Sequence, residues 1–302
     1  MGKTGTDAEK NYHYCEAHKP DVFAQGGWKA DLYGNLQKGI VMISAIPTEK
    51  LTGVTVQGDL SDFYELVDAI YRITGLENAD RDLFWGVKNR LLGVCYDIRH
   101  AYMGDRNVLF VDNGMDDEKM KWHSMITPKQ NVYYSAEILF PEAVFLAAAV
   151  PSILEYSCIY YGPNGRCTDP DWVPLPYSYY LKDKGMIQTL CGAIWQALDE
   201  VIGVDETYKL LCTNNRRDGY GYGDYKYADY VTMYIDKCNI EYLKTPLEKR
   251  PDKIRNIAKR IITKPAAYMK MENEMKECAQ KYGCSIYDLK RDDLKYPEEI
   301  EW

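Results

Sequence analysis

The chain has 302 residues, of which 46% are hydrophobic and 27% charged, a balance typical of a globular protein and unlike that of a disordered chain. Its net charge of −8 argues against a protein coated in nucleic acid but is compatible with a local basic site. Nine irregularly spaced cysteines without a Cys-x-x-Cys pair argue against a disulfide scaffold and predict a reducing, cytoplasmic setting. The longest apolar stretch, around residues 143–154, is shorter than a membrane span, so no membrane partner is expected.

The first half of the chain alternates between strand and helix patterns. Val54 and Val56 alternate with polar neighbours, as in a half-buried strand. After Ser61, which is predicted to begin a helix, apolar residues recur every three or four positions. The predicted order is strand 39–46, strand 51–57, helix 61–75, helix 82–103, strand 107–111, a polar loop 112–130, strand 131–137 and helix 141–155.

The second half shows only helical periodicity. Glycines and prolines concentrate in residues 161–178, which predicts a linker. Thr245-Pro-Leu-Glu248 has the form of a capping box that begins a helix. The helices predicted here are 186–202, 205–212, 225–238 and 265–282. The predicted fold class is α+β, with a sheet-plus-helix domain over residues 1–160, of which 1–38 form an N-terminal arm, and a mainly helical unit over 179–302.

The densest polar motif is residues 96–106, Tyr-Asp-Ile-Arg-His-Ala-Tyr-Met-Gly-Asp-Arg. On a helix, Asp97 and His100 share a face, and Arg90 lies two turns earlier on the same side. An Asp that orients a His is a minimal general base, and Arg106 can hold a phosphate or an oxyanion. One interpretation is therefore a nuclease or other phosphohydrolase with Asp97, His100 and Arg106 as catalytic residues. The other, which we favour, is a polar network that locks the helix end to the next strand, because no Ser or Cys nucleophile with a local signature lies beside the motif.

The N-terminus carries a candidate metal-binding cluster. His13, Cys15 and His18 place three potential zinc ligands within six residues. A zinc site needs three or four ligands in a fixed tetrahedral arrangement, and no further ligand cluster is apparent. Neither a metal nor a cofactor is therefore predicted.

A basic segment covers residues 244–276, where ten Lys and Arg stand against four Asp and Glu, a local charge of +6. On a helix, Lys249, Lys253, Arg260 and Lys264 form a face opposite a row of isoleucines. This face would suit a nucleic-acid backbone or an acidic protein partner. The alternative is a solvated face that docks on the acidic part of the same chain, and the sequence leaves both open.

A glycine- and tyrosine-rich stretch precedes the basic segment. Arg216, Arg217, Tyr220 and Tyr222 alternate with glycines there, and rings beside cations are what single-stranded nucleic-acid binding uses. A lid or contact loop explains the pattern equally well. These four residues are grouped with the four basic helix residues as binding candidates.

Three stretches, residues 54–66, 96–106 and 131–141, resemble a family of uncharacterised proteins from bacteria and their mobile elements. The resemblance covers about residues 40–155, and the middle stretch is its most specific part. It implies a bacterial cytoplasmic setting and a part in phage–host conflict, such as antiviral defence. It brings no established activity, so no catalytic role is carried over to these positions.

No complete catalytic set is present in the sequence. The sequence therefore favours a non-enzymatic binding or assembly protein that contacts an acidic partner or nucleic acid through its basic C-terminal half. The 27 tyrosines also suit interfaces in a homo-oligomer or larger complex. The alternative is the phosphohydrolase built on residues 97, 100 and 106.

Overall fold

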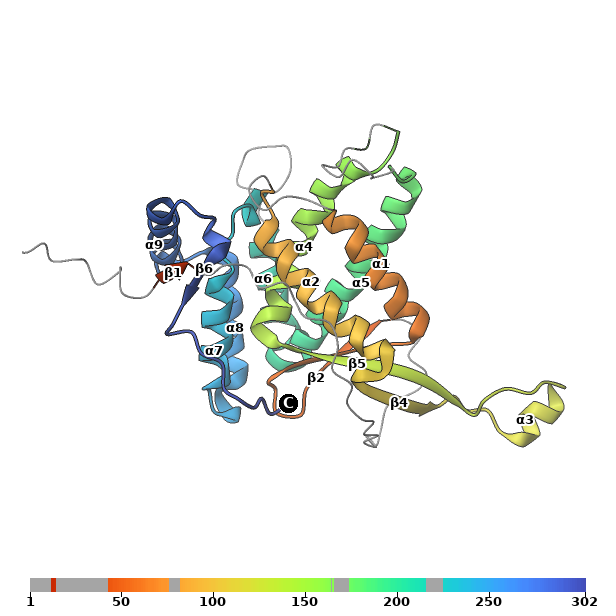
Figure 1. Ribbon diagram of the computed structural model, residues 1–302. Coiled ribbons are helices and arrows are strands. Elements are labelled where there is room, and N and C mark those ends of the chain that lie inside the picture. Colours follow the sequence, from red (N-terminus) through yellow and green to blue (C-terminus); the bar gives the residue numbers. More distant parts are fainter. Residues whose placement is uncertain (1–11, 15–42, 76–81, 164, 166–173, 216–224) are drawn as a thin grey trace, which may run out of the picture.

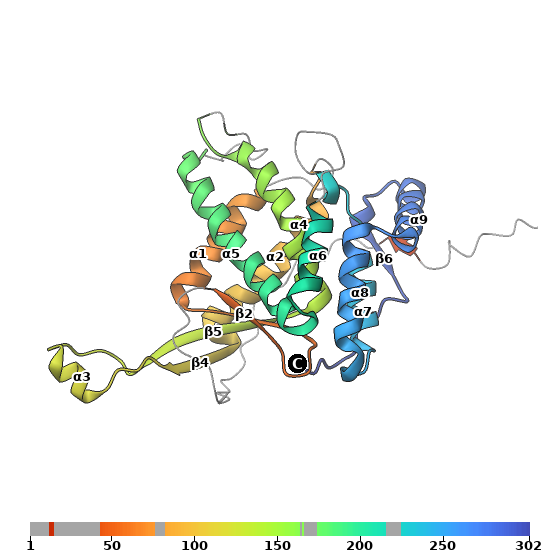
Figure 2. The ribbon, with the colours of Figure 1, turned by 180° about the vertical axis from the view of Figure 1, so that it is seen from behind.

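A computed structural model describes residues 12–14, 43–75, 82–163, 165, 174–215 and 225–302. Within them, a four-stranded antiparallel sheet is combined with long helices, so the predicted α+β fold class is confirmed. Figure 1 shows α1, α2, α4 and α5 standing over one face of the sheet, with α7, α8 and α9 beside them. The view from behind in Figure 2 shows the same arrangement.

The sheet has the strand order β2-β3-β5-β4. Alternate residues of β3 and β5 are buried under the helices, among them Val54, Val56, Ala136 and Ile138, as period-two alternation requires. The four strands fall where strands were predicted, with shifted ends, and the predicted residues 39–42 lie outside the described residues. Their bounds are β2 (Ser44–Pro47), β3 (Gly53–Gly58), β4 (Asn107–Asp112) and β5 (Gln130–Leu139).

The first helices also follow the predicted order. Helix α1 (Leu60–Thr74) is capped by Asp59, whose side chain accepts a hydrogen bond from the backbone N–H of Asp62, so the predicted start at Ser61 is two residues late. Helix α2 (Trp85–His100) continues into one π-helical turn, η2 (Ala101–Asp105). Gly104 has a φ of 90° in this turn, which only glycine adopts without strain.

Helix α4 (Phe140–Ser157) is buried on nearly every side. Together with the short 3₁₀ turn after it, residues Phe140–Tyr160 are 21 residues long and apolar enough to cross a membrane by length and composition. The predicted stretch 143–154 was therefore too short. Because most of this helix is buried inside the protein, its apolar character is that of a core helix.

Several elements of the second half differ from the prediction. Helix α5 (Tyr177–Ile202) begins nine residues earlier than predicted, and the predicted helix 225–238 is a 3₁₀ turn followed by α7 (Met233–Leu243). The predicted capping box is wrong, because the Thr245 hydroxyl donates to the backbone oxygen of Glu241 at 3.0 Å. The remaining helices are α6 (Val204–Asn214), α8 (Arg250–Thr263) and α9 (Ala266–Tyr282), and β6 (Leu289–Arg291) pairs with β1 (Tyr12–Tyr14).

Helices on both sides of the predicted linker share one hydrophobic cluster. Helix α4 packs against α1 and α2 from the first half and against α5, α7 and α8 from the second. The C-terminal tail also returns to the sheet, where the Thr52 hydroxyl donates to the backbone oxygen of Glu301. The division at residues 161–178 stays a prediction, but the parts on either side of it have a common core.

A buried carboxylate connects α1, α5 and the start of the predicted linker. Arg72 binds both oxygens of Asp183 at 2.8 Å, and the Tyr161 hydroxyl donates to the same carboxylate at 2.9 Å. The side chain of Asp183 is fully buried. A buried carboxylate of this kind is stable only because all its partners are present.

The Asp183→Ala substitution should therefore destabilise the fold strongly. It leaves a guanidinium and a phenol without their partner, and removing one member of a buried ion pair costs about 3–5 kcal/mol. Urea unfolding followed by circular dichroism measures the loss. Glu206→Gln is the matched control, since Glu206 pairs with Lys209 on the exposed surface of α6, and it should leave the midpoint unchanged. Equal effects of the two substitutions would contradict the prediction.

Candidate functional site

The polar motif at residues 96–106 lies at the end of α2 and in the π-helical turn after it. Arg106 donates to Asp97 at 2.7 Å, so these two predicted residues do meet. The Nδ1 atom of His100, however, lies 2.8 Å from a carboxylate oxygen of Asp105. The turn at Gly104 brings Asp105 back onto the helix end, and the ring of His100 therefore pairs with Asp105 instead of Asp97.

These contacts lie on the surface. Asp97, Asp105 and Arg106 expose 39%, 53% and 45% of their side chains, and His100 exposes 25%. Exposed ion pairs contribute about 0–1 kcal/mol. The ring of Tyr96 packs on that of His100 with centroids 4.2 Å apart. The geometry is that of a surface network joining a helix end to β4, and the catalytic roles of Asp97, His100 and Arg106 stay predictions.

Arg90, which helical spacing placed on the same side as His100, points into the protein instead. Its guanidinium donates to Glu142 on α4 at 3.0 Å, to the backbone oxygen of Thr232 at 2.9 Å and to Asp236 on α7. Helix α2 thus presents Arg90 to the core between the helices and His100 to the surface.

Two further residues complete what we call the Arg90 network, which consists of Arg90, Glu142, Asp236, Asn239 and Tyr296. The Asn239 amide donates to Glu142 at 3.1 Å and to the Tyr296 hydroxyl at 3.0 Å, and that hydroxyl donates to Asp236 at 2.8 Å. Burial raises the pKa of the Glu142 carboxyl, and the nearby Arg90 and Asn239 offset only part of this rise. Sequence spacing gave no signal for this network because its members come from four distant segments.

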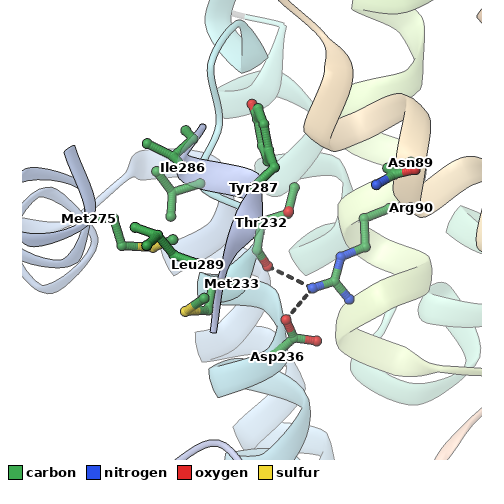
Figure 3. A pocket seen from close by; sticks show the side chains of 10 residues that line it. Asn89, Arg90, Thr232, Met233, Asp236, Met275, Ile286, Tyr287 and Leu289 are labelled. Carbon is green, nitrogen blue, oxygen red and sulfur yellow. Dashed lines mark hydrogen bonds and ion pairs between the residues drawn. The ribbon is translucent and has the colours of Figure 1, made fainter. Parts of the chain in front are cut away.

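A cavity of about 280 Å³ lies beside the Arg90 network (Figure 3). One side is polar, with Asn89, Arg90, Thr232 and Asp236, and the other carries apolar side chains of α9 and of the segment leading into β6. Because the guanidinium is already bound by two carboxylates and a carbonyl, the cavity offers little unpaired charge to an anion. Among the residues described, no three His, Cys, Asp or Glu lie close enough to hold a metal ion, and Cys15 and His18 of the N-terminal cluster fall outside them.

Of the four basic helix residues predicted to face a partner, two form ion pairs within the protein and two form none with the described residues. Arg260 binds Glu241 through two nitrogens at 2.6 and 3.1 Å, and Lys253 binds the same carboxylate. Although burial acts to raise it, these two cations lower the pKa of Glu241 to about 2. Lys264 lies over the rings of two tyrosines, with its nitrogen 5.3 and 5.6 Å from their centroids, and burial lowers its pKa. Lys249 is exposed. Two of the four cations are thus paired within the protein, and the binding role of the face stays a prediction.

The other predicted binding residues, Arg216, Arg217, Tyr220 and Tyr222, lie outside the described residues. The chain on either side of them is held together, because the Tyr227 hydroxyl donates to the Asn214 side chain at 2.6 Å. The Asn214 amide in turn donates to a backbone oxygen of α4 at 3.0 Å. Both ends of the stretch are therefore fixed to the core.

The structure contains a projecting hairpin that the sequence did not predict. Residues 130–133 of β5 pair only with β4, while residues 136–139 pair only with β3. Residues 109–133 therefore form a two-stranded ribbon, here called the arm, which carries a short helix, α3 (Asp117–Trp122), at its end. Figures 1 and 2 show the arm extending away from the rest of the protein. The length of the predicted loop 112–130 was the available signal, since loops of this length without structure are uncommon in compact domains.

The arm leaves several large apolar side chains in solvent. No residue of α3 is buried. Trp122 is 81% exposed and Ile126 is 98% exposed. The exposed apolar residues of the arm, here called the arm patch, are Phe110, Trp122, Met125, Ile126 and Val132. Large apolar side chains gathered in solvent on one element mark interaction sites more often than solitary exposed residues do.

The pairing of Glu241 predicts a pH-dependent stability. The Glu241→Gln variant should lose about 1–2 kcal/mol at pH 7, because two cations lose a charged partner in a partly exposed site. The folded-state pKa of about 2 lies below the ordinary value of 4.5, so this stabilisation is present above about pH 4.5 and is lost as the pH falls toward 2. Urea unfolding of both proteins across this range tests it, with exposed Glu248→Gln as control. Stability curves that remain parallel down to pH 2 would contradict the assignment.

Residues 43–302 match the model of a family described as a domain of unknown function, DUF6904. The matched range includes the sheet, the arm, residues 161–178 and the C-terminal helices. No curated protein and no solved structure matches the chain. Because the match covers most of the sequence, the chain belongs to the DUF6904 family.

Proposed function

We propose that this protein is a non-enzymatic binding or assembly protein that contacts another protein through its arm. The observation that carries the proposal is the arm patch, which places a tryptophan and an isoleucine almost fully in solvent at the end of a projecting hairpin. Removing apolar side chains in such a position from water lowers the free energy, and this requires a partner that covers them.

The arm supports this function better than the basic helix α8 does. Lys253 and Arg260 already share a carboxylate inside the protein, so binding a phosphate backbone would compete with Glu241. An acidic partner or a nucleic acid at the remaining exposed cations is a weaker proposal, and steep dependence of binding on salt concentration is its signature.

The setting that fits this role is the bacterial cytoplasm, as the resemblance over residues 40–155 implies. Cys95, Cys191 and Cys238 are buried free thiols, which supports a reducing compartment. A part in phage–host conflict rests on the resemblance alone.

Replacing the two most exposed arm residues tests the proposal. A variant with Trp122→Ser and Ile126→Ser should lose the protein association that the wild type shows in chemical cross-linking and sedimentation. Its melting temperature should stay unchanged, because neither side chain is buried. The matched control is Leu181→Ser with Val204→Ser, two exposed apolar residues on α5 and α6. If the wild type associates with nothing, or if both variants retain its partners, the proposed function is wrong.

A second candidate function, a phosphohydrolase, has one observation in its favour. The pairing of His100 with Asp105 orients the imidazole as a general base requires, and the Arg106 guanidinium lies on the same surface. Against it, the described residues hold no group of three His, Cys, Asp or Glu side chains that could bind a catalytic metal ion.

The His100→Ala variant separates the two functions. Since the His100 pair is a surface contact, we expect the melting temperature to change by no more than about 2 °C. We also expect neither protein to hydrolyse single-stranded DNA, RNA or p-nitrophenyl phosphate. Hydrolysis by the wild type that falls at least about 100-fold in the variant would favour the phosphohydrolase, given the usual contribution of a general base.

A further inference from the structure

We propose that the partner of the arm is a second copy of this chain, in a two-fold dimer in which each arm covers the body of the other copy. This inference rests on the proposed function and names the partner of the same surface. Three observations support it: a second apolar surface at the base of the arm, the small number of contacts that stabilise the arm alone, and the charges on the two surfaces.

The second apolar surface, here called the body patch, consists of Leu60, Tyr64 and Met103. They lie in the first turns of α1 and in η2, and they expose 52%, 55% and 62% of their surface. Tyr64 is near the ring of Tyr102, also in η2, with centroids 6.3 Å apart. The chain therefore carries two separate apolar surfaces, one on the arm and one where the arm leaves the body.

Two residues of the arm patch, Phe110 and Val132, lie on the same side of the sheet as the body patch. Ala136 and Ile138 point toward the helices, and Val132 lies on the same face of β5 because side chains alternate along a strand. Phe110 is opposite Val132 in the register of β4 and β5. The helix-side face of the arm thus continues toward η2, which contacts both β4 and β5. A copy approaching from this side meets the body patch and the strand residues of the arm patch.

The arm alone is a marginal structure. A two-stranded hairpin is at best marginally stable in water, and an isolated helix needs about 12–15 residues to form, whereas α3 has six and buries none of them. One face of the ribbon has a small buried cluster of Leu109, Val111 and Tyr133. Phe110 and Val132 on the other face are 61% and 40% exposed, so this face has room for a partner.

The exposed area is that of a dimer interface. With the usual surface of large apolar side chains, the arm patch and the body patch together expose on the order of 1,000 Å². A stable interface of standard size buries about 800 Å² on each partner. In an isologous dimer each copy contributes both patches, so one two-fold axis covers all of this surface in two equal contacts.

One pair of opposite charges is available between the two surfaces, although the arm as a whole is slightly acidic, with Asp112, Asp116, Asp117 and Glu118 against Lys119, Lys121 and Lys129. Within the arm, Asp116 pairs with Lys119 and Asp117 with Lys129, but Lys121, next to Trp122, has no ion pair among the described residues. The first turns of α1, around Leu60 and Tyr64, carry Asp59 and Asp62, and also Glu65, which already pairs with Lys182 at 3.1 Å.

Like charges lie close together within that acidic group. Burial raises the pKa of Asp62, and the charges of Asp59 and Glu65 raise it further, despite a backbone hydrogen bond that lowers it. The tip of a second copy's arm would bring a lysine to these carboxylates. A nucleic acid or an anionic membrane would meet the same carboxylates with charge of the same sign, and for this reason we favour the second copy.

Sedimentation equilibrium of the full-length protein tests the dimer. The wild type should have twice the 34.9 kDa mass of the chain, and both patches should be needed for dimerisation. An arm variant with Trp122→Ser and Ile126→Ser, and a body variant with Leu60→Ser and Met103→Ser, should each sediment mainly as monomers. The control with Leu181→Ser and Val204→Ser should remain dimeric, and circular dichroism should be the same for all four proteins.

A mixing experiment tests the reciprocal arrangement. In the proposed dimer, an arm variant and a body variant together retain one intact contact, since the normal arm of one meets the normal body patch of the other. The mixture should therefore form heterodimers that neither variant forms alone. A mixture that stays monomeric beside a dimeric wild type would overturn the arm-to-body arrangement.

Other outcomes separate this inference from the proposed function. A monomeric wild type whose arm variant loses a different protein partner overturns the dimer while the proposed function stands. A monomeric wild type that binds vesicles containing anionic lipid, or single-stranded DNA, through the arm overturns the dimer in favour of that ligand. A monomeric wild type for which the arm variant changes no association overturns both proposals.

Discussion

Helix α4 has no polar face, and the rest of the structure is arranged to cover it. Almost every residue from Phe140 to Leu154 is buried, so helices must pack around its whole circumference. The sheet and helices α1 and α2 supply one part of this cover, and α5, α7 and α8 supply the other. A single core follows from this constraint, even though glycines and prolines between residues 161 and 178 resemble a boundary between domains.

Buried polar clusters determine how the covering elements are oriented around α4. Arg90 joins α2 to α4 and α7, and Arg72 joins α1 to α5 through Asp183. A third pair, Lys88 and Asp82, lies fully buried at the start of α2, where the lysine also donates to the Tyr160 hydroxyl at 2.8 Å. Apolar packing tolerates small rotations of a helix, whereas a desolvated ion pair tolerates very little. We infer that these clusters select one arrangement among the several that hydrophobic burial alone would allow.

The polar groups on the surface have a different character from those in the core. The contacts of His100 and Arg106 are partly exposed and local in sequence, so they contribute little to stability, and their residues remain accessible. The arm differs from the rest of the described structure because it places several large apolar side chains in solvent. A region that exposes apolar surface and is only marginally stable alone is suited to binding, since its free energy is lowered most when a partner is present.

The sequence by itself determined the α+β class, most strands and helices, and the apolar face of each helix, because these depend on periods of two and 3.6 residues that are local. It also identified residues 96–106 as a polar helix end, where Gly104 turns the chain. Only the tertiary structure decided which charges meet. Helical spacing placed Arg90 beside His100, yet its partner Asp236 lies 146 residues away, and no local pattern records such a distance. Likewise, the net charge of residues 244–276 is visible in the sequence, but the pairing of Lys253 and Arg260 with Glu241 depends on how α7 packs on α8. The arm was hidden for the same reason: whether an apolar side chain such as Ile126 is covered depends on the surrounding fold and not on its neighbours in sequence.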